Sequence, residues 1–184
     1  MCSLQPLSVH INMILNKLKP KIYQIWNTKL KNNNTTALRI WMLKNSADIP
    51  YRIKLFNRTY SYPAQRPIML ETYDVKTLYT NIPHQDLLTK IWELFECISG
   101  LTKHQDMMIA SNRKGCKLVY GNSIDHLKSG WKQFYSLQDV MYMIEFLVSH
   151  TDITINDNCY QQLIGIPMGT NAGVNIVDFY LAKV

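Results

Sequence analysis

Helix-forming and strand-forming patterns alternate along this chain, and the alternation narrows the possible folds more than any other feature. Apolar residues recur at helical spacing in 84–99 and again in 137–147. Two short stretches of strand type, 152–156 and 159–164, flank the turn residues 156–158. The patterns predict a domain of helices and short strands, and 184 residues are enough for it to bury a core.

Proline and glycine predict where the longer helices end. The apolar spacing of 7–19 predicts a helix that ends at Pro20, because proline lacks the amide that the helix needs. A second helix is expected over 21–31. Gly100 is expected to end the next long helix, since glycine favours the position just beyond a helix C-terminus.

Several shorter segments carry weaker signals. Residues 37–45 are expected to form a short helix, whereas 51–66 show no clear period. Ser136 and Asp139 have the spacing of a capping box and should open a helix. A final helix is expected from about Asn171.

The middle of the chain is expected to hold little regular structure. Residues 101–115 resemble a loop. Residues 117–122 and 130–135 could pair with one another as a hairpin or form two short edge strands.

Positive charge is concentrated in the first third of the chain. Residues 1–66 contain eleven Lys and Arg and one acid, Asp48, which gives +10, whereas 67–184 contain nine Lys and Arg and twelve acids, which gives −3. A basic segment interleaved with aromatic residues suits a phosphate backbone. Lysines that merely solubilise amphipathic helices remain an equal alternative on charge alone.

Cysteine usage and hydropathy indicate an intracellular protein. The cysteines form no CxxC pair and have no histidine at zinc spacing, so we expect no disulfides and no zinc site; they are Cys2, Cys97, Cys116 and Cys159. No apolar run reaches the length of a membrane span, and the N-terminus lacks the features of a signal peptide. We therefore expect no membrane segment.

Asp74 is the first candidate for chemistry. It stands at the end of the apolar, strand-like stretch 68–75, where a carboxylate can serve Mg²⁺, a cation that takes oxygen ligands. For an isolated aspartate at a strand end, a turn-stabilising or helix-capping role is the more common one. The residues that follow Asp74 favour the metal.

The segment DVKTLYTNIPH, beginning at Asp74, and the segment YQQLIGIPMGTNAG, about eighty residues later, resemble motifs A and B of reverse transcriptases. The variant is most similar to Penelope-like retroelements, whose polymerase is related to telomerase. The upstream segments WMLKNS and PLSVHINMILNKLKPKI resemble the connection between fingers and palm in the same elements. The resemblance covers nearly the whole chain and implies an α+β fold, with the antiparallel sheet of a right-hand polymerase palm backed by helices.

The resemblance also implies roles for the residues after the first motif. Asp74 would be the catalytic residue that binds Mg²⁺, together with the backbone carbonyl of Val75. Backbone amides near Thr77 and Leu78 would face the triphosphate of the incoming nucleotide. Tyr79 would stack beneath its sugar and exclude a 2′-hydroxyl, which favours deoxynucleotides.

The second motif would supply a loop against the template base and the nascent pair. Its implied residues are Gly165, Pro167, Met168 and Gly169. Glycine suits a backbone that approaches a ligand closely. Many reverse transcriptases have glutamine at the position of Met168, whereas Penelope-like elements carry methionine.

The resemblance divides the chain into two parts. Residues 1–66 would be a basic, mainly helical connection, and 67–184 a partial palm that stops before motif C. No two acids are adjacent anywhere in the sequence, so the Asp-Asp pair of motif C is absent, as are the fingers motifs and the thumb. Because two-metal chemistry needs several carboxylates, we expect this chain alone not to polymerise DNA.

Two functions follow as hypotheses. The first is a fragment of a reverse transcriptase that in its full form takes an RNA template, a DNA primer, dNTP and Mg²⁺, and that is nuclear if expressed. The second is a noncatalytic, basic nucleic-acid-binding remnant. Only the first requires Asp74 to matter for magnesium.

Overall fold

The computed structural model describes the chain in several stretches and divides it into two compact units. The described residues are 4–32, 46–59, 76–101, 107–112, 115–120, 130–131, 133–166 and 169–182. Residues 1–37 and 77–184 belong to the first unit, and 38–76 to the second.

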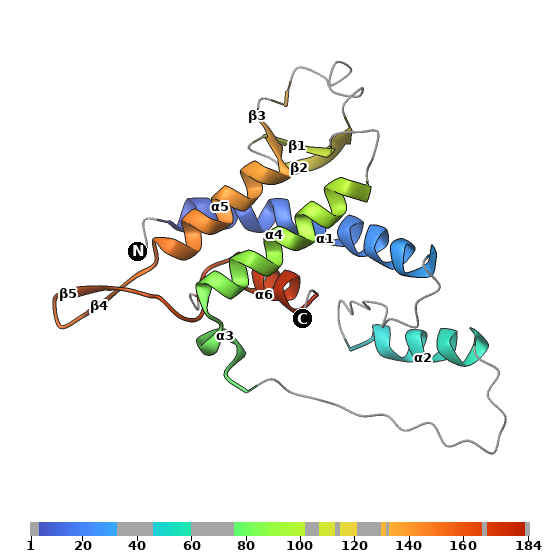
Figure 1. Ribbon diagram of the computed structural model, residues 1–184, viewed down its shortest axis with the longest axis horizontal. Helices are drawn as coiled ribbons and strands as arrows, with labels where there is room; N and C mark the ends of the chain where they lie inside the picture. The colour runs from blue at the N-terminus through green and yellow to red at the C-terminus, as the bar shows by residue number, and fades with distance from the viewer. Residues whose placement is uncertain are drawn as a thin grey trace. The chain divides into compact units, whose positions relative to one another are not determined.

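The described part of the first unit combines five helices with two small antiparallel sheets (Figure 1). The helices are α1 (Gln5–Asn32), α3 (Leu78–Asn81), α4 (His84–Leu101), α5 (Leu137–Ser149) and α6 (Gly173–Leu181). The strands are β1 (Met107–Asn112), β2 (Gly115–Tyr120), β3 (Gln133–Ser136), β4 (Asp152–Ile155) and β5 (Asn158–Gln161). The expected mixed α+β class is confirmed.

The core lies among α1, α4, α5 and α6, which pack on one another (Figure 1). Phe179 of α6 is fully buried and meets the ring of Phe95 on α4 edge to face, with their centroids 6.0 Å apart. Each helix buries one apolar stripe, as its spacing predicts. The stripes include Ile11, Ile14, Leu15, Leu18 and Ile22 of α1, Leu87, Ile91 and Leu94 of α4, Val140, Ile144 and Leu147 of α5, and Ile176 and Val177 of α6.

The larger sheet corrects one expectation from the sequence and decides between two others. Its strand order is β2-β1-β3, and both neighbours pair antiparallel with β1. The prediction of a loop over 101–115 is wrong, because β1 lies within that range. Of the two arrangements expected for 117–122 and 130–135, the two edge strands are confirmed and the hairpin is not, since β1 separates β2 from β3.

The smaller sheet is the hairpin of β4 and β5, and it confirms the predicted strands and turn. Asn156 and Asp157 form the turn with φ values of 47° and 66°. Positive φ at both central residues is the geometry that two-residue hairpins prefer, and Asn and Asp tolerate it. All residues of both strands are exposed, so the hairpin projects from the helical core (Figure 1).

The capping box that opens α5 is confirmed atom by atom. Ser136 Oγ accepts the amide of Asp139 at 3.1 Å, and the Asp139 carboxylate accepts the amide of Ser136 at 2.7 Å. The two bonds satisfy two donors that a helix N-terminus leaves without partners.

Of the two predicted helix ends, the one at Pro20 is wrong. α1 continues through Pro20, because Leu18, Ile22 and Tyr23 on either side of the proline are buried in the core. Their tertiary packing outweighs the one backbone hydrogen bond that the exposed proline removes. The end predicted at Gly100 agrees with the structure to within one residue, because α4 runs to Leu101.

The second unit contains helix α2, Asp48–Thr59, which overlaps the range 51–66 for which the sequence showed no period. Several of its apolar residues are exposed, namely Ile49, Tyr51, Ile53 and Leu55. The helix predicted over 37–45 and the strand predicted over 68–75 lie outside the described residues.

Neither membrane spans nor disulfides occur in the described parts of the chain. No helix found there is both long and apolar enough to cross a membrane. Cys116 is buried with a free thiol, and Cys159 is exposed with a free thiol.

Candidate functional site

The two sequence motifs meet in the structure, at a seam formed by residues 79–84 and 164–166. Pro83 and Ile164 form an isolated antiparallel bridge. The amide of Gly165 donates to the carbonyl of Ile82 at 2.8 Å. Segments that lie about eighty residues apart in the sequence are therefore joined directly, backbone to backbone.

The peptide unit that links Gly165 to Ile166 is held at both ends. Its carbonyl oxygen accepts a hydrogen bond from His84 Nε2 at 2.6 Å. Its amide donates to the carbonyl of Tyr79 at 2.6 Å. Because the peptide is planar, these two contacts together fix its orientation.

Only glycine fits at position 165. Its φ is +88°, in the region that glycine adopts readily and other residues rarely adopt. A β-carbon there would lie 2.8 Å from the Tyr79 carbonyl oxygen and 3.0 Å from Thr80 Cα. The close approach of the two backbones therefore depends on the missing side chain.

A tight turn at Thr77 leads into the seam. Thr77 has a φ of 54°, a left-handed conformation that is uncommon for a β-branched residue. Its carbonyl accepts the amides of Thr80 and Asn81 at 3.0 and 3.1 Å, and its hydroxyl accepts Asn81 Nδ2 at 2.6 Å. These contacts hold the strained turn, and strain of this kind is common at ligand sites.

Leu78 and Tyr79 connect the turn to the core. Both side chains are partly buried and pack against the helical core. Tyr79 therefore has a fixed backbone, held through Ile166, and a ring supported from one side. A half-buried aromatic ring on a fixed backbone can present its remaining surface to a ligand.

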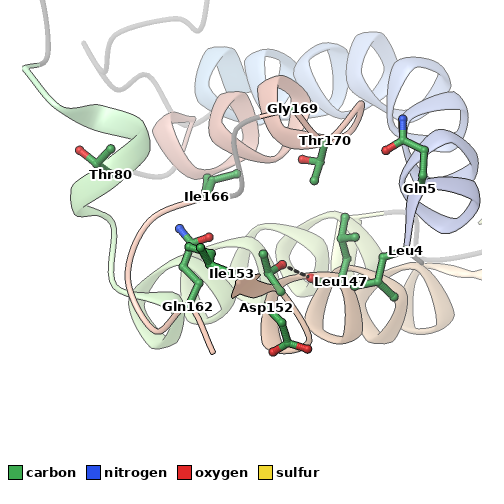
Figure 2. A pocket seen from close by; sticks show the side chains of 11 residues that line it. Leu4, Gln5, Thr80, Leu147, Asp152, Ile153, Gln162, Ile166, Gly169 and Thr170 are labelled. Carbon is green, nitrogen blue, oxygen red and sulfur yellow. Dashed lines mark hydrogen bonds between the residues drawn. The ribbon is translucent and has the colours of Figure 1, made fainter. Parts of the chain in front are cut away.

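A pocket of about 490 Å³ opens beside the seam (Figure 2). It is lined by Leu4, Gln5, Thr80, Leu147, Thr151, Asp152, Ile153, Gln162, Ile166, Gly169 and Thr170. Asp152 is the ionisable residue of this lining, and its carboxylate points away from the open space in Figure 2. The wall is thus apolar with hydroxyl and amide groups and carries no positive charge.

The base of the β4–β5 hairpin forms one wall of this pocket. Thr151 Oγ1 donates to the carbonyl of Leu147 at 2.9 Å, the contact drawn in Figure 2. The amide of Gln162 donates to the carbonyl of Thr151 at 2.9 Å, and Gln162 Nε2 donates to that of Ile164 at 2.9 Å. These bonds tie the hairpin to the end of α5 and to the seam.

Contacts with α1 hold the far side of the second motif. The amide of Ala172 donates to Ser8 Oγ at 3.1 Å, where both residues are fully buried. Further along α6, Lys19 forms an ion pair with Asp178 and donates to Asn175 Oδ1 at 3.0 Å. Burial, and secondly the charge of Asp178, raises the pKa of Tyr23, whose hydroxyl donates to the Asp178 carbonyl. Asp178 thus has a structural role.

The structure brings some of the predicted site residues together and not others. Thr77, Leu78 and Tyr79 lie on one side of the seam, and Gly165 lies on the other. Gly169, with a φ of +94°, lies on the pocket wall. The remaining predicted residues lie outside the described part of the chain; they are Asp74, Val75, Pro167 and Met168.

Within the described residues, no group of three or more His, Cys, Asp and Glu could hold a metal ion. The magnesium expected from the sequence therefore depends on Asp74 and Val75, which the described stretches do not include.

His84 and Ile82 are the contacts that the sequence did not single out. The Ile82 contact is made by its backbone carbonyl, which any residue carries, so no sequence signal could have identified it. His84 had a signal, because it closes the segment DVKTLYTNIPH directly after Pro83.

Comparison with family models, with curated proteins and with solved structures gave no match in any of the three.

Proposed function

We propose that this chain is part of a reverse transcriptase and that the seam between its two motifs belongs to the deoxynucleotide site of the polymerase palm. The observation that carries the proposal is the hydrogen bond from the Ile166 amide to the Tyr79 carbonyl at 2.6 Å. Motifs A and B were recognised from separate stretches of sequence, and a shared nucleotide site requires them to be adjacent. Their joined backbones meet that requirement.

Within this proposal, Tyr79 lies beneath the sugar of the incoming nucleotide and Gly165 lets the second motif approach it. Thr77 and Leu78 belong to the turn whose backbone faces the triphosphate. The second motif, from Gly165 through Gly169, contacts the template base and the nascent pair. The activity of the whole enzyme would be template-directed DNA synthesis from RNA.

Asp74 and the carbonyl of Val75 are the proposed ligands of Mg²⁺. Such an ion would neutralise charge on the triphosphate. Polymerisation needs additional carboxylates, so binding of substrate, rather than turnover, is the property to test in this chain.

The test is the affinity of a fluorescent dNTP for the purified chain with an RNA–DNA primer-template, with and without Mg²⁺. We expect Mg²⁺ to increase the affinity of the wild type and Asp74→Asn to abolish that increase. Asp157→Asn is the matched control, because Asp157 is exposed in the hairpin turn and asparagine tolerates its positive φ. Equal effects of Mg²⁺ on wild type and Asp74→Asn would refute the proposal.

The second candidate is a noncatalytic nucleic-acid-binding role, favoured by the charge of helix α2. Lys54 and Arg58 are exposed on that helix, and Asp48 is its acidic residue. This role predicts binding whose affinity falls linearly with salt on a log–log scale. It predicts that any effect of Mg²⁺ is the same in wild type and Asp74→Asn, so the same titration separates the two candidates.

A further inference from the structure

We propose that His84 is a positioning residue that holds Tyr79 against the second motif and thereby sets which sugar the site accepts. The inference rests on the proposed function for the sugar, and on the geometry of the seam for the positioning.

The coupling runs through one peptide unit. His84 Nε2 donates to the Gly165 carbonyl at 2.6 Å, across 81 residues of sequence. The amide at the other end of that peptide, on Ile166, donates to the Tyr79 carbonyl at 2.6 Å. Because a peptide plane is rigid, a rotation of the carbonyl away from His84 would turn the amide away from Tyr79.

This peptide needs an external contact, because Gly165 does not fix its orientation. Glycine has a broad range of backbone conformations, and the φ of +88° is one of several that it can adopt. The other described contacts between the two segments of the seam, from Gly165 to Ile82 and between Pro83 and Ile164, join backbone to backbone, and Gln162 Nε2 bonds to Ile164 within the second segment alone. Among these described contacts, His84 is the residue whose side chain bonds across the two segments.

His84 is well placed to act as a fixed support. It is the first residue of α4, and Leu87 and Ile91 of that helix are fully buried in the core. The imidazole therefore moves with the core and not with the loop that it contacts. A group carried by a rigid element positions its partner more accurately than a group on a loop.

The test compares His84→Ala with His84→Gln, whose side-chain amide also carries an N–H donor. Two quantities are measured: the exchange protection of the Ile166 amide, and the ratio of dNTP to NTP affinity. We expect His84→Ala to reduce both by about fivefold, the effect of one hydrogen bond, and His84→Gln to restore part of each. His150→Ala is the control, since His150 is exposed and contacts Phe146 within its own helical turn.

The possible outcomes test the positioning role and the sugar-selecting role of His84 separately. Unchanged protection of Ile166 in His84→Ala would overturn the positioning role. Reduced protection with an unchanged affinity ratio would overturn the sugar-selecting role. A wild-type chain that binds no nucleotide would refute the proposed function and with it the sugar-selecting role, whereas the exchange measurement would still decide the positioning role. Partial rescue by His84→Gln excludes general misfolding as the cause.

Discussion

A β-carbon built on Gly165 would lie 2.8 Å from the carbonyl oxygen of Tyr79, which is closer than real β-carbons come to such atoms. The two residues belong to different motifs, and their backbones lie in direct contact. The obstructing atom is a backbone oxygen, so it cannot move aside as a flexible side chain could. The distance between the motifs is therefore set by the absence of a side chain at Gly165.

This contact predicts that two glycine substitutions lower the free energy of unfolding by different amounts. Gly165→Ala combines the clash with a positive φ and should destabilise the fold by about 2–4 kcal/mol. Gly169→Ala has a similar φ of +94° but open space around the new carbon, so it should cost only about 1 kcal/mol. Urea unfolding followed by circular dichroism measures both. Equal costs would mean that the clash at Gly165 is relieved and that the seam is not tightly closed.

The capping box predicts coupling between Ser136 and Asp139. Removing either side chain should cost about 1 kcal/mol, because a donor at the start of α5 loses its partner. The double variant should cost clearly less than the sum of the single ones, since the two groups act on each other. A double-mutant cycle by urea unfolding measures this coupling, and additive costs would contradict the reciprocal bonding.

The sequence predicted the elements whose signals are local. The capping box, the hairpin turn at Asn156 and Asp157, and the apolar face of α4 each lie within one continuous stretch of sequence. Strand β1 was missed because six residues, MMIASN, carry too short a pattern, and their strand conformation depends on the partners at either side. The prediction that a helix ends at Pro20 was wrong for a related reason, because the burial of Ile22 and Tyr23 depends on the whole core.

The resemblance named the candidate residues, but it did not name the bonds that join them. Tyr79 and Gly165 could be named from the resemblance, and the φ of Gly165 fits the expected need for glycine. The bonds that join them run between backbone groups, which every residue has, so no pattern of side chains encodes them. His84 is the exception, since its side chain contributes one of these bonds directly.

Burial of His10 predicts a loss of stability in mild acid. His10 packs edge to face on Tyr135 with centroids 5.4 Å apart, and its Nε2 is buried without a hydrogen-bond partner in the described residues. Burial lowers the pKa of His10 below its ordinary value of 6.5. Above pH 6.5 the imidazole is neutral in both states, and below it the unfolded chain takes up a proton that the folded state resists.

Stability should therefore fall as the pH decreases from about 7.5 to about 5.5, and the fall should be smaller in His10→Phe, which keeps a ring against Tyr135. Unfolding free energies from urea titrations at several pH values measure the difference. His150→Phe serves as the control, because His150 is exposed. Parallel pH profiles for wild type and His10→Phe would show that His10 does not carry the effect.

The burial of Phe179 predicts how much stability the fold loses when this side chain is removed. It is fully buried and contacts the rings of Phe95 and Tyr23 at centroid distances of 6.0 and 6.5 Å. Phe179→Ala should destabilise the first unit by about 3–5 kcal/mol, through lost burial and the cavity left behind. Phe146→Ala on the exposed side of α5 should cost less than about 1 kcal/mol. Similar melting temperatures for the two variants would contradict the placement of α6 at the core.

The proposed position of Tyr79 beneath the sugar predicts the relative affinity of the site for dNTP and NTP. If its ring lies beneath the incoming nucleotide, Tyr79→Ala should remove the obstacle to a 2′-hydroxyl and raise NTP affinity relative to dNTP by about tenfold, the effect of about 1.4 kcal/mol. Its fixed backbone, bonded to Ile166, means that shortening the side chain leaves the seam in place. Tyr142→Ala is the matched control, because that tyrosine is exposed on α5. Competition between labelled dNTP and unlabelled NTP, with primer-template and Mg²⁺ present, gives the ratio. An unchanged ratio in Tyr79→Ala, with dNTP binding retained, would place the sugar away from Tyr79.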